Sequence, residues 1–261
     1  MLLSHSHNFL FVHLAKTGGT SVRAALSSRS WRDPLHWPTF FCHRVSEFCG
    51  HRLGCKIPRH APALVAKELL PPTFFDELFK FSFVRNPWDR VVSAYHHFER
   101  ERRDVLAEQR IRDIAHFTDW LLDVPLNETS RAGLVAALRR PQIEHLVDFH
   151  GNLLVDFVGR YEHLPEDFQW VVEQVAFKGV KLPHKRRSQR PRDYRLSYTD
   201  RMAEQVADHF APDIAAFEYS FDPPDLLEIN RKDAAHRMRN HSVNPFVLGR
   251  HKPQDGKSIK C

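Results

Sequence analysis

The sequence predicts an α/β fold that contains a P-loop, with a mainly parallel central sheet and helices on both of its faces. Two observations support this prediction. Apolar strand patterns alternate with amphipathic helix patterns along the chain, which is typical of βαβ units. Two of the strands, ending near residues 14 and 84, run into a polar turn that opens a helix. No run of about 18 apolar residues occurs, so no membrane span is expected.

The N-terminal part is expected to begin with a buried strand that starts at Asn8, followed by a helix over about residues 20–28. An irregular, aromatic-rich segment follows over residues 30–58, and loops of this length are usually functional. Pro62 can then start a short helix that runs to Leu70.

The middle of the chain holds the second expected strand, over residues 79–84. Pro87 fits the first position of the following helix, where its missing N–H costs nothing. Val91, Tyr95 and Phe98 lie on one face of that helix because they are spaced at i, i+4 and i+7. A further helix is expected over residues 111–122.

The third strand is expected over residues 152–158, and helices over residues 165–177 and 199–210, with a basic loop at 181–195 between these helices. We therefore expect one α/β domain over residues 1–222. Residues 223–261 form a polar, proline-punctuated tail with few apolar anchors. Such a composition predicts partial disorder.

The first strand-to-helix turn has the composition of an anion site. A helix N-terminus offers unpaired N–H groups and a partial positive charge. Gly18 and Gly19 allow close approach of the backbone, and Lys16 adds a full charge. Hydroxyl donors come from Thr17, Thr20 and Ser21. These residues predict a site for phosphate or a chemically close group; the competing interpretation is a plain turn with a surface lysine.

The order of residues in this turn differs from that of a Walker A loop. In that motif the lysine follows the last glycine and precedes the Ser or Thr that binds magnesium. Here Lys16 comes before both glycines. An ordinary ATPase is therefore disfavoured.

The bulk composition narrows the ligands and the compartment. The 261 residues include 38 Lys and Arg against 32 Asp and Glu, a net charge of +6 with histidine neutral. This balance suits anionic ligands such as nucleotides, acidic glycans or nucleic acid, without choosing among them. No signal peptide is recognisable. Four cysteines are too few for a disulfide framework, so a reducing cytoplasm is the expected compartment.

Three of the cysteines, Cys42, Cys49 and Cys55, are close in sequence and interleaved with His43 and His51. A zinc site is conceivable there, but no C-x-x-C pair exists. Free thiols fit this spacing better, and we expect no metal.

A second anion site is expected at the end of the second strand. Arg85 ends that strand, and Ser93 lies about two turns into the next helix. With a rise of ~1.5 Å per residue, both side chains can reach one anion, Arg85 with its fork and Ser93 with its hydroxyl. The alternative is an arginine that caps the sheet and a serine that faces solvent.

Taken together, the two turns resemble the sulfotransferase superfamily, and most closely its carbohydrate (heparan- and chondroitin-type) members in a compact bacterial form. The resemblance rests on Lys-Thr-Gly-Gly-Thr-Ser at 16–21 and Phe-Val-Arg-Asn-Pro-Trp-Asp-Arg-Val-Val-Ser-Ala-Tyr at 83–95. Weaker similarity continues at 154–162, 182–184 and 209–221.

The resemblance implies a donor, 3′-phosphoadenosine 5′-phosphosulfate (PAPS), and the product adenosine 3′,5′-bisphosphate. It implies that residues 16–21 hold the 5′-phosphosulfate and that Arg85 and Ser93 hold the 3′-phosphate. By the same resemblance Arg186 and Ser188 also contact the nucleotide. A solvated basic loop is the competing interpretation of that last segment.

Sulfuryl transfer resembles phosphoryl transfer, in which catalysis is mainly positioning and electrostatic stabilisation. Lys16 is expected to stabilise charge on the bridging oxygen. The acceptor hydroxyl needs a base, and histidine suits neutral pH. His60 is the candidate, because the family places a catalytic histidine in a comparable segment. Glu162 is the reserve base; its alternative role is a structural charge.

Two other classes of function remain open from the sequence. One is a P-loop phosphotransferase such as a nucleotide kinase, which the order of the motif disfavours. The other is a non-enzymatic polyanion-binding protein, although no nucleic-acid motif is present. The family implies a hydroxyl acceptor on a sugar or glycoconjugate, while the sequence does not define the acceptor or the oligomeric state.

Overall fold

The structure, a computed structural model, describes residues 1–27, 57–123, 133–176, 179–183 and 193–222, together with the single positions 41 and 45. Several predictions fall outside this part of the chain. They concern the three cysteines at positions 42, 49 and 55, the nucleotide contacts Arg186 and Ser188, and the tail over residues 223–261.

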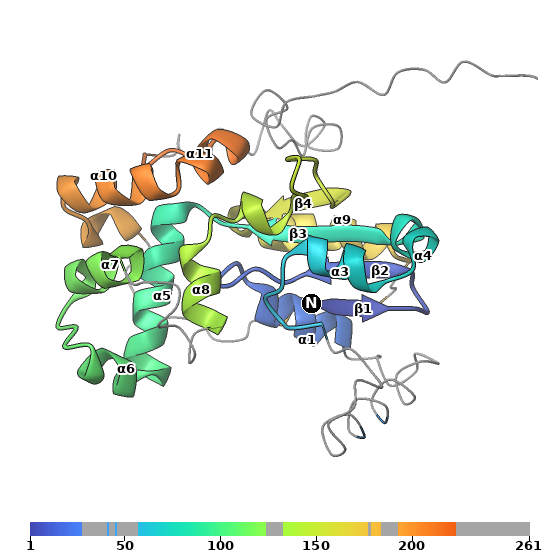
Figure 1. Cartoon of the computed structure of the whole chain (residues 1–261), viewed down its shortest axis with the longest axis horizontal. Coiled ribbons are helices and arrows are strands. Elements are labelled where there is room, and N and C mark those ends of the chain that lie inside the picture. Colours follow the sequence, from blue (N-terminus) through green and yellow to red (C-terminus); the bar gives the residue numbers. More distant parts are fainter. Residues whose placement is uncertain are drawn as a thin grey trace, which may run out of the picture.

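A four-stranded sheet forms the centre of the fold (Figure 1). Its strands, in spatial and chain order, are β1 (Leu2–Ser4), β2 (Phe9–Val12), β3 (Phe79–Val84) and β4 (Phe157–Arg160). β1 pairs with β2 antiparallel, whereas β2–β3 and β3–β4 are parallel. The carboxyl ends of β2, β3 and β4 therefore lie at one edge of the sheet, where ligands of α/β folds bind.

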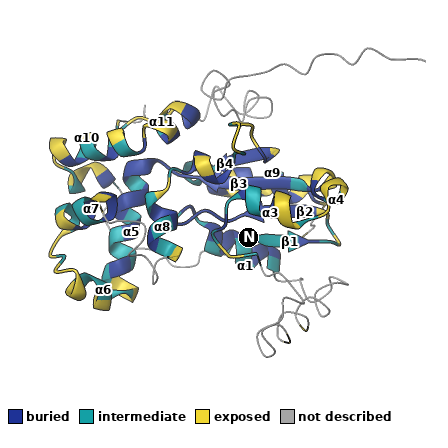
Figure 2. Ribbon diagram, viewed as in Figure 1, coloured by how far each residue is buried: buried dark blue, intermediate teal, exposed yellow. Residues whose placement is uncertain are grey.

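Strands β2, β3 and β4 are mostly buried (Figure 2). Their side chains alternate between two separate apolar clusters, one on each face of the sheet. One face is aromatic and packs against α1 (Gly19–Leu26) and α9 (Leu164–Gln174). Its strand residues are Phe9, Phe11, Phe81, Phe83 and Phe157. The ring centroids of Phe11 and Phe81, which are partners across β2 and β3, lie 5.2 Å apart.

The opposite face carries aliphatic strand residues such as Leu10, Val12 and Val84. These residues belong to the same cluster as apolar residues from three helices, α3 (Ala63–Leu69), α4 (Pro72–Glu77) and α5 (Pro87–Glu101). The predicted α/β class, a central sheet flanked by helices, is confirmed.

Beyond the sheet, a group of helices gathers around α5 (Figure 1). They are α6 (Arg103–Glu108), α7 (Ile114–Asp123), α8 (Gly133–Arg139), α10 (Asp200–His209) and α11 (Ala211–Phe217). Three short 3₁₀ turns, η3 (Ile143–His145), η4 (Tyr161–His163) and η5 (Tyr194–Ser197), precede β4, α9 and α10 in turn along the described part of the chain. Among the described residues, no helix is long and apolar enough to cross a membrane.

The third strand differs from its prediction. The apolar run at 152–158 predicts a strand over its whole length, but β4 begins only at Phe157. The chain reaches β3 one residue earlier, where the Asp156 N–H donates to the Lys80 carbonyl at 2.7 Å. Before that point Leu153 makes only an isolated bridge to Val147. An apolar run marks burial, and the position of the neighbouring strand decides which part of it pairs.

Candidate functional site

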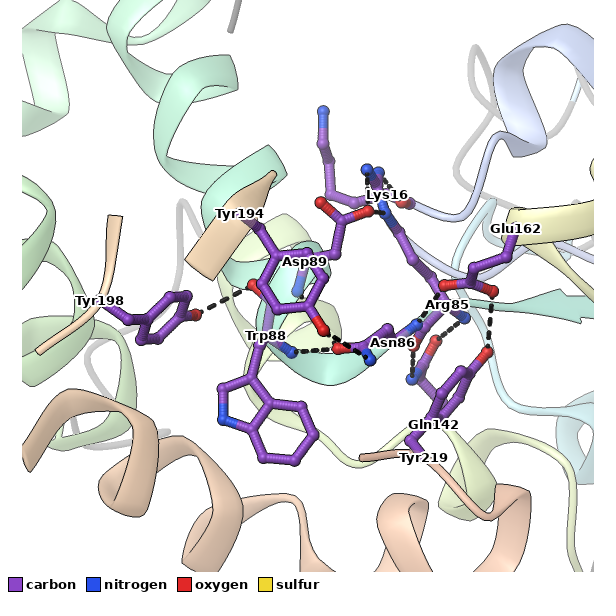
Figure 3. Close-up of polar contacts among 10 residues, drawn as sticks. All are labelled: Lys16, Arg85, Asn86, Trp88, Asp89, Gln142, Glu162, Tyr194, Tyr198 and Tyr219. Carbon is purple, nitrogen blue, oxygen red and sulfur yellow. Dashed lines mark hydrogen bonds and ion pairs between the residues drawn. The ribbon is translucent and has the colours of Figure 1, made fainter. Parts of the chain in front are cut away.

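The two predicted anion turns lie side by side at the carboxyl edge of the sheet. The first connects β2 to α1, and the second connects β3 to α5. Arg85 joins them, because its Nη1 donates to the carbonyl oxygen of Lys16 at 3.0 Å (Figure 3). The structure therefore brings together the two segments that the sequence analysis selected.

The first turn has an unusual backbone at two of its residues, one a lysine and one a glycine. Lys16 has φ 68° and Gly18 has φ 78°, both in the left-handed region. A Cβ added to Gly18 would lie 2.6 Å from Leu164 Cδ2, and one added to Gly19 would lie 2.1 Å from His13 Cδ2. Both positions therefore require glycine, and Gly18 caps the start of α1.

Four consecutive carbonyls of this turn each accept a hydrogen bond from a side chain. The pairs are His13 with His60 Nδ1 at 2.9 Å, Leu14 with Thr17 Oγ1 at 3.2 Å, Ala15 with Arg90 Nε at 3.2 Å and Lys16 with Arg85 Nη1 at 3.0 Å. These bonds tie the backbone of the turn to the segment before α3 and to the start of α5.

The hydroxyl residues of the turn have different environments. Thr17 is fully buried, and its hydroxyl serves the turn's own backbone. Thr20 is half-buried in the first turn of α1, and Ser21 is 9% exposed. Thr20 and the Lys16 side chain are therefore the more accessible polar groups here, both of intermediate exposure.

Arg85 is almost entirely covered, with 3% of its surface exposed. Its Nε and Nη2 lie 2.7 and 2.6 Å from Asp89 Oδ2, and the guanidinium carbon lies 3.8 Å from the centre of the Tyr161 ring. Ser93 is half-buried further along α5, and the described contacts of Arg85 do not include it. Asp89 and Tyr161 are partners that sequence reasoning missed, because neither stands in an anion-binding pattern.

The start of α5 is fixed by Asn86, which is 4% exposed. Its Oδ1 accepts from the N–H groups of Trp88 and Asp89 at 3.1 and 3.4 Å, and its Nδ2 donates to Tyr194 Oη at 3.2 Å and to the Ser220 carbonyl at 2.9 Å. This cap anchors the second turn to both the helix and the C-terminal segment of the domain.

Glu162, in the turn η4 that follows β4, supports the same junction. Its Oε1 accepts the Asn86 N–H at 2.8 Å, and Tyr219 Oη donates to its Oε2 at 3.2 Å (Figure 3). Removal from water raises the pKa of this carboxyl. Both oxygens are engaged by structural groups, which is the arrangement expected of a structural charge.

His60 lies beside the first turn, just before α3. Its Nδ1 bonds the His13 carbonyl, which can only accept, so Nδ1 carries the proton. Burial lowers the pKa of His60, with Arg59 and Arg90 adding to the shift. A neutral ring protonated on Nδ1 has its lone pair on Nε2, which is the form that a general base requires.

The described part of the chain contains no group of three or more His, Cys, Asp or Glu residues arranged to hold a metal ion.

Comparison with known proteins identifies the family. The model of the sulfotransferase family matches residues 1–220. An uncharacterized protein of Archaeoglobus fulgidus is 28% identical over 115 residues, which cover 44% of this chain and 82% of that protein. No solved structure matches the chain. The family match spans the sheet, both anion turns and the helices around α5, so the chain belongs to the sulfotransferase family and is a sulfuryl-transferring enzyme.

Proposed function

We propose that this protein transfers the sulfuryl group of PAPS to a hydroxyl of a carbohydrate or glycoconjugate. The observation that carries the proposal is the hydrogen bond from Arg85 to the Lys16 carbonyl, which joins the two turns predicted to bind anions at one edge of the sheet. PAPS has two anionic ends, a 5′-phosphosulfate and a 3′-phosphate. A donor with this charge pattern suits two neighbouring cationic turns.

The turn at residues 16–21 would act as the phosphate-binding loop for the 5′-phosphosulfate. Its glycine spacing and its inward carbonyls support this role. Arg85 has five N–H donors, and three are bonded to Asp89 and Lys16, which leaves two (5 − 3) for the 3′-phosphate. Ser93 would add its hydroxyl, and Arg186 and Ser188 would add contacts from the basic loop.

In this proposal Lys16 stabilises negative charge on the oxygen that leaves with the nucleotide. His60 takes the proton of the acceptor hydroxyl on Nε2, while the His13 carbonyl holds its other nitrogen. The donor supplies the sulfuryl group together with a phosphate leaving group. Positioning and charge stabilisation account for this chemistry, and residues 1–222 form the catalytic domain.

The test is titration calorimetry with adenosine 3′,5′-bisphosphate, adenosine 5′-monophosphate and ATP with Mg²⁺. We expect micromolar binding of the bisphosphate without Mg²⁺ and a strong preference over the monophosphate. Arg85→Ala should abolish most of that preference. Binding of ATP only with Mg²⁺ would indicate a phosphotransferase instead, and binding of neither nucleotide would indicate a polyanion-binding protein.

The acceptor is tested separately. Radiolabelled PAPS is incubated with the protein and a panel of glycans, glycolipids and small hydroxylated molecules. Label should move to a hydroxyl of a sugar-containing acceptor. Transfer to non-sugar acceptors alone would contradict the carbohydrate assignment and leave the donor assignment intact.

A further inference from the structure

Gln142 and Asp213 form a buried polar pair directly behind Arg85, and the chemistry proposed above does not use them. Both residues are 0% exposed. Gln142 lies between α8 and η3, and Asp213 lies in the first turn of α11. They come from segments about 57 and 128 residues beyond Arg85 in the sequence (142 − 85 and 213 − 85).

The Gln142 amide holds the backbone of Arg85 at the point where β3 leaves the sheet. The Arg85 N–H donates to Gln142 Oε1 at 2.9 Å, and Gln142 Nε2 donates to the Arg85 carbonyl at 2.8 Å (Figure 3). Val84, one residue earlier, is the last residue of β3 that pairs with β4. Gln142 thus gives Arg85 the pair of bonds that a neighbouring strand would otherwise give.

Asp213 in turn fixes Gln142. Its Oδ2 accepts from the Gln142 N–H at 2.8 Å and from Nε2 at 3.1 Å, and its Oδ1 accepts from the Ile143 N–H at 2.9 Å. Both hydrogens of Nε2 and the Oε1 acceptor are therefore used. Glutamine alone combines one acceptor and two donors at this length, so neither Glu nor Met can replace its bonds.

We propose that Gln142, held by Asp213, is a positioning residue that sets the affinity of Arg85 for the 3′-phosphate. The argument rests on the proposed function. Gln142 holds the Arg85 backbone, while Asp89, Tyr161 and the Lys16 carbonyl contact its guanidinium. A shift of this backbone would pull the guanidinium away from these contacts and displace it relative to the first turn. A misplacement of ~1 Å at such a group can cost about 10²-fold in function.

The experiment compares wild type with Gln142→Glu in titrations with adenosine 3′,5′-bisphosphate and adenosine 5′-monophosphate. The measured quantity is the dissociation constant of the monophosphate divided by that of the bisphosphate. Gln142→Glu removes both Nε2 donors and sets a carboxylate against Asp213 and the Arg85 carbonyl. We expect the ratio to fall about tenfold or more while monophosphate affinity stays at the wild-type value.

Gln205→Glu is the matched control. Gln205 Nε2 donates to Asp119 Oδ1 at 3.0 Å between α10 and α7, so this change also sets a new carboxylate against an existing one. It should leave the ratio unchanged. Gln142→Met, which is uncharged and of similar length, is the second test variant if Gln142→Glu does not fold.

A wild-type ratio in a folded Gln142 variant would overturn the positioning role while the proposed function stands. Equal loss of affinity for both nucleotides would also overturn it, because the effect would not be specific to the 3′-phosphate. Failure of both variants to fold, under conditions where Gln205→Glu is folded, would assign Gln142 to stability alone. A wild type that does not prefer the bisphosphate would refute the proposed function itself.

Discussion

Lys16 occupies a backbone conformation that residues with a Cβ seldom adopt, with φ 68°. Such a conformation costs about 1–2 kcal/mol, and the surrounding hydrogen bonds must hold it in place. The carbonyl of the same residue is held by Arg85 at 3.0 Å. A strained lysine in a turn that opens a helix is consistent with a functional rather than a structural charge.

Lys16→Ala should lower the rate of sulfuryl transfer by about a hundredfold or more, because one lost transition-state contact typically costs ~2.7–4 kcal/mol. Steady-state kinetics with PAPS and an acceptor measure the effect, and a melting curve checks the fold. Lys67→Ala is the control. Lys67 lies on α3, outside the turn, and its Nζ is 3.8 Å from Asp148 Oδ2. A rate within threefold of wild type would exclude the role of Lys16.

His60→Ala should lower turnover by roughly 10²–10⁴ and leave nucleotide affinity unchanged. Burial lowers the pKa of His60 from 6.5, so the neutral base predominates at neutral pH and is lost only as pH falls. The wild-type pH–rate profile should therefore show an acidic limb below pH 6.5 that disappears in the variant. Full activity of His60→Ala combined with inactivity of Glu162→Gln would move the base to Glu162.

At the scale of the elements, the junction between β3 and α5 contributes Arg85 to the candidate site. The residue that caps α5 at this junction also makes hydrogen bonds to other segments. Asn86 caps α5 and also bonds Tyr194 and Ser220. Thr199 caps α10 at the surface with one bond, from the Met202 N–H at 3.4 Å. The two caps differ in burial and in the number of partners they hold.

Asn86→Ala should destabilise the domain by about 2–3 kcal/mol, since it removes a cap worth ~1 kcal/mol and leaves buried partners unpaired. Thr199→Ala should cost no more than about 1 kcal/mol. Urea unfolding followed by circular dichroism measures both. Equal losses in the two variants would show that the additional bonds of Asn86 contribute nothing.

The sequence predicts β2, β3 and the longer helices because each has a local pattern, such as the apolar run at 79–84 or Pro87 at the helix start. It does not predict β1, three residues preceding a polar turn, whose identity depends on pairing with β2. Lys16 and Arg85 could be placed at strand ends for the same local reason. Gln142 and Asp213 could not, because their role depends on contacts across more than 50 residues.

In the molecule as a whole, buried neutral histidines make stability depend on pH. Burial lowers the pKa of His13 to about 2 and that of His145 to about 3, with nearby cationic groups such as Arg90 adding to the shift of His145. Below pH 6.5 the unfolded chain therefore binds protons that the native state cannot bind. The contribution of these histidines to stability is therefore retained above their unfolded-state pKa of 6.5 and is lost as pH falls below it.

His145→Leu should remove one of the protons that the chain takes up on unfolding. Between about pH 6 and pH 4, the slope of unfolding free energy against pH should decrease by roughly 1.4 kcal/mol per pH unit relative to wild type. Contributions from His13, and the opposite ones from the raised pKa values of Glu162 and Asp213, are present in both proteins and cancel. Parallel slopes for the two proteins would show that His145 does not titrate on unfolding.

The carbonyls of residues 13–16 accept hydrogen bonds from donors that, apart from Thr17, lie 47 to 75 positions further along the chain, in His60, Arg85 and Arg90. The conformation of this turn therefore depends on residues far outside the turn itself. Grafting residues 9–26 onto another α/β scaffold would transfer the glycines and the lysine but not the donors that hold the turn's carbonyls, so we expect the graft not to carry the proposed anion site. A functional transplant needs the strand and helix that carry the arginines, and during synthesis the turn is completed only after the chain has passed Arg90.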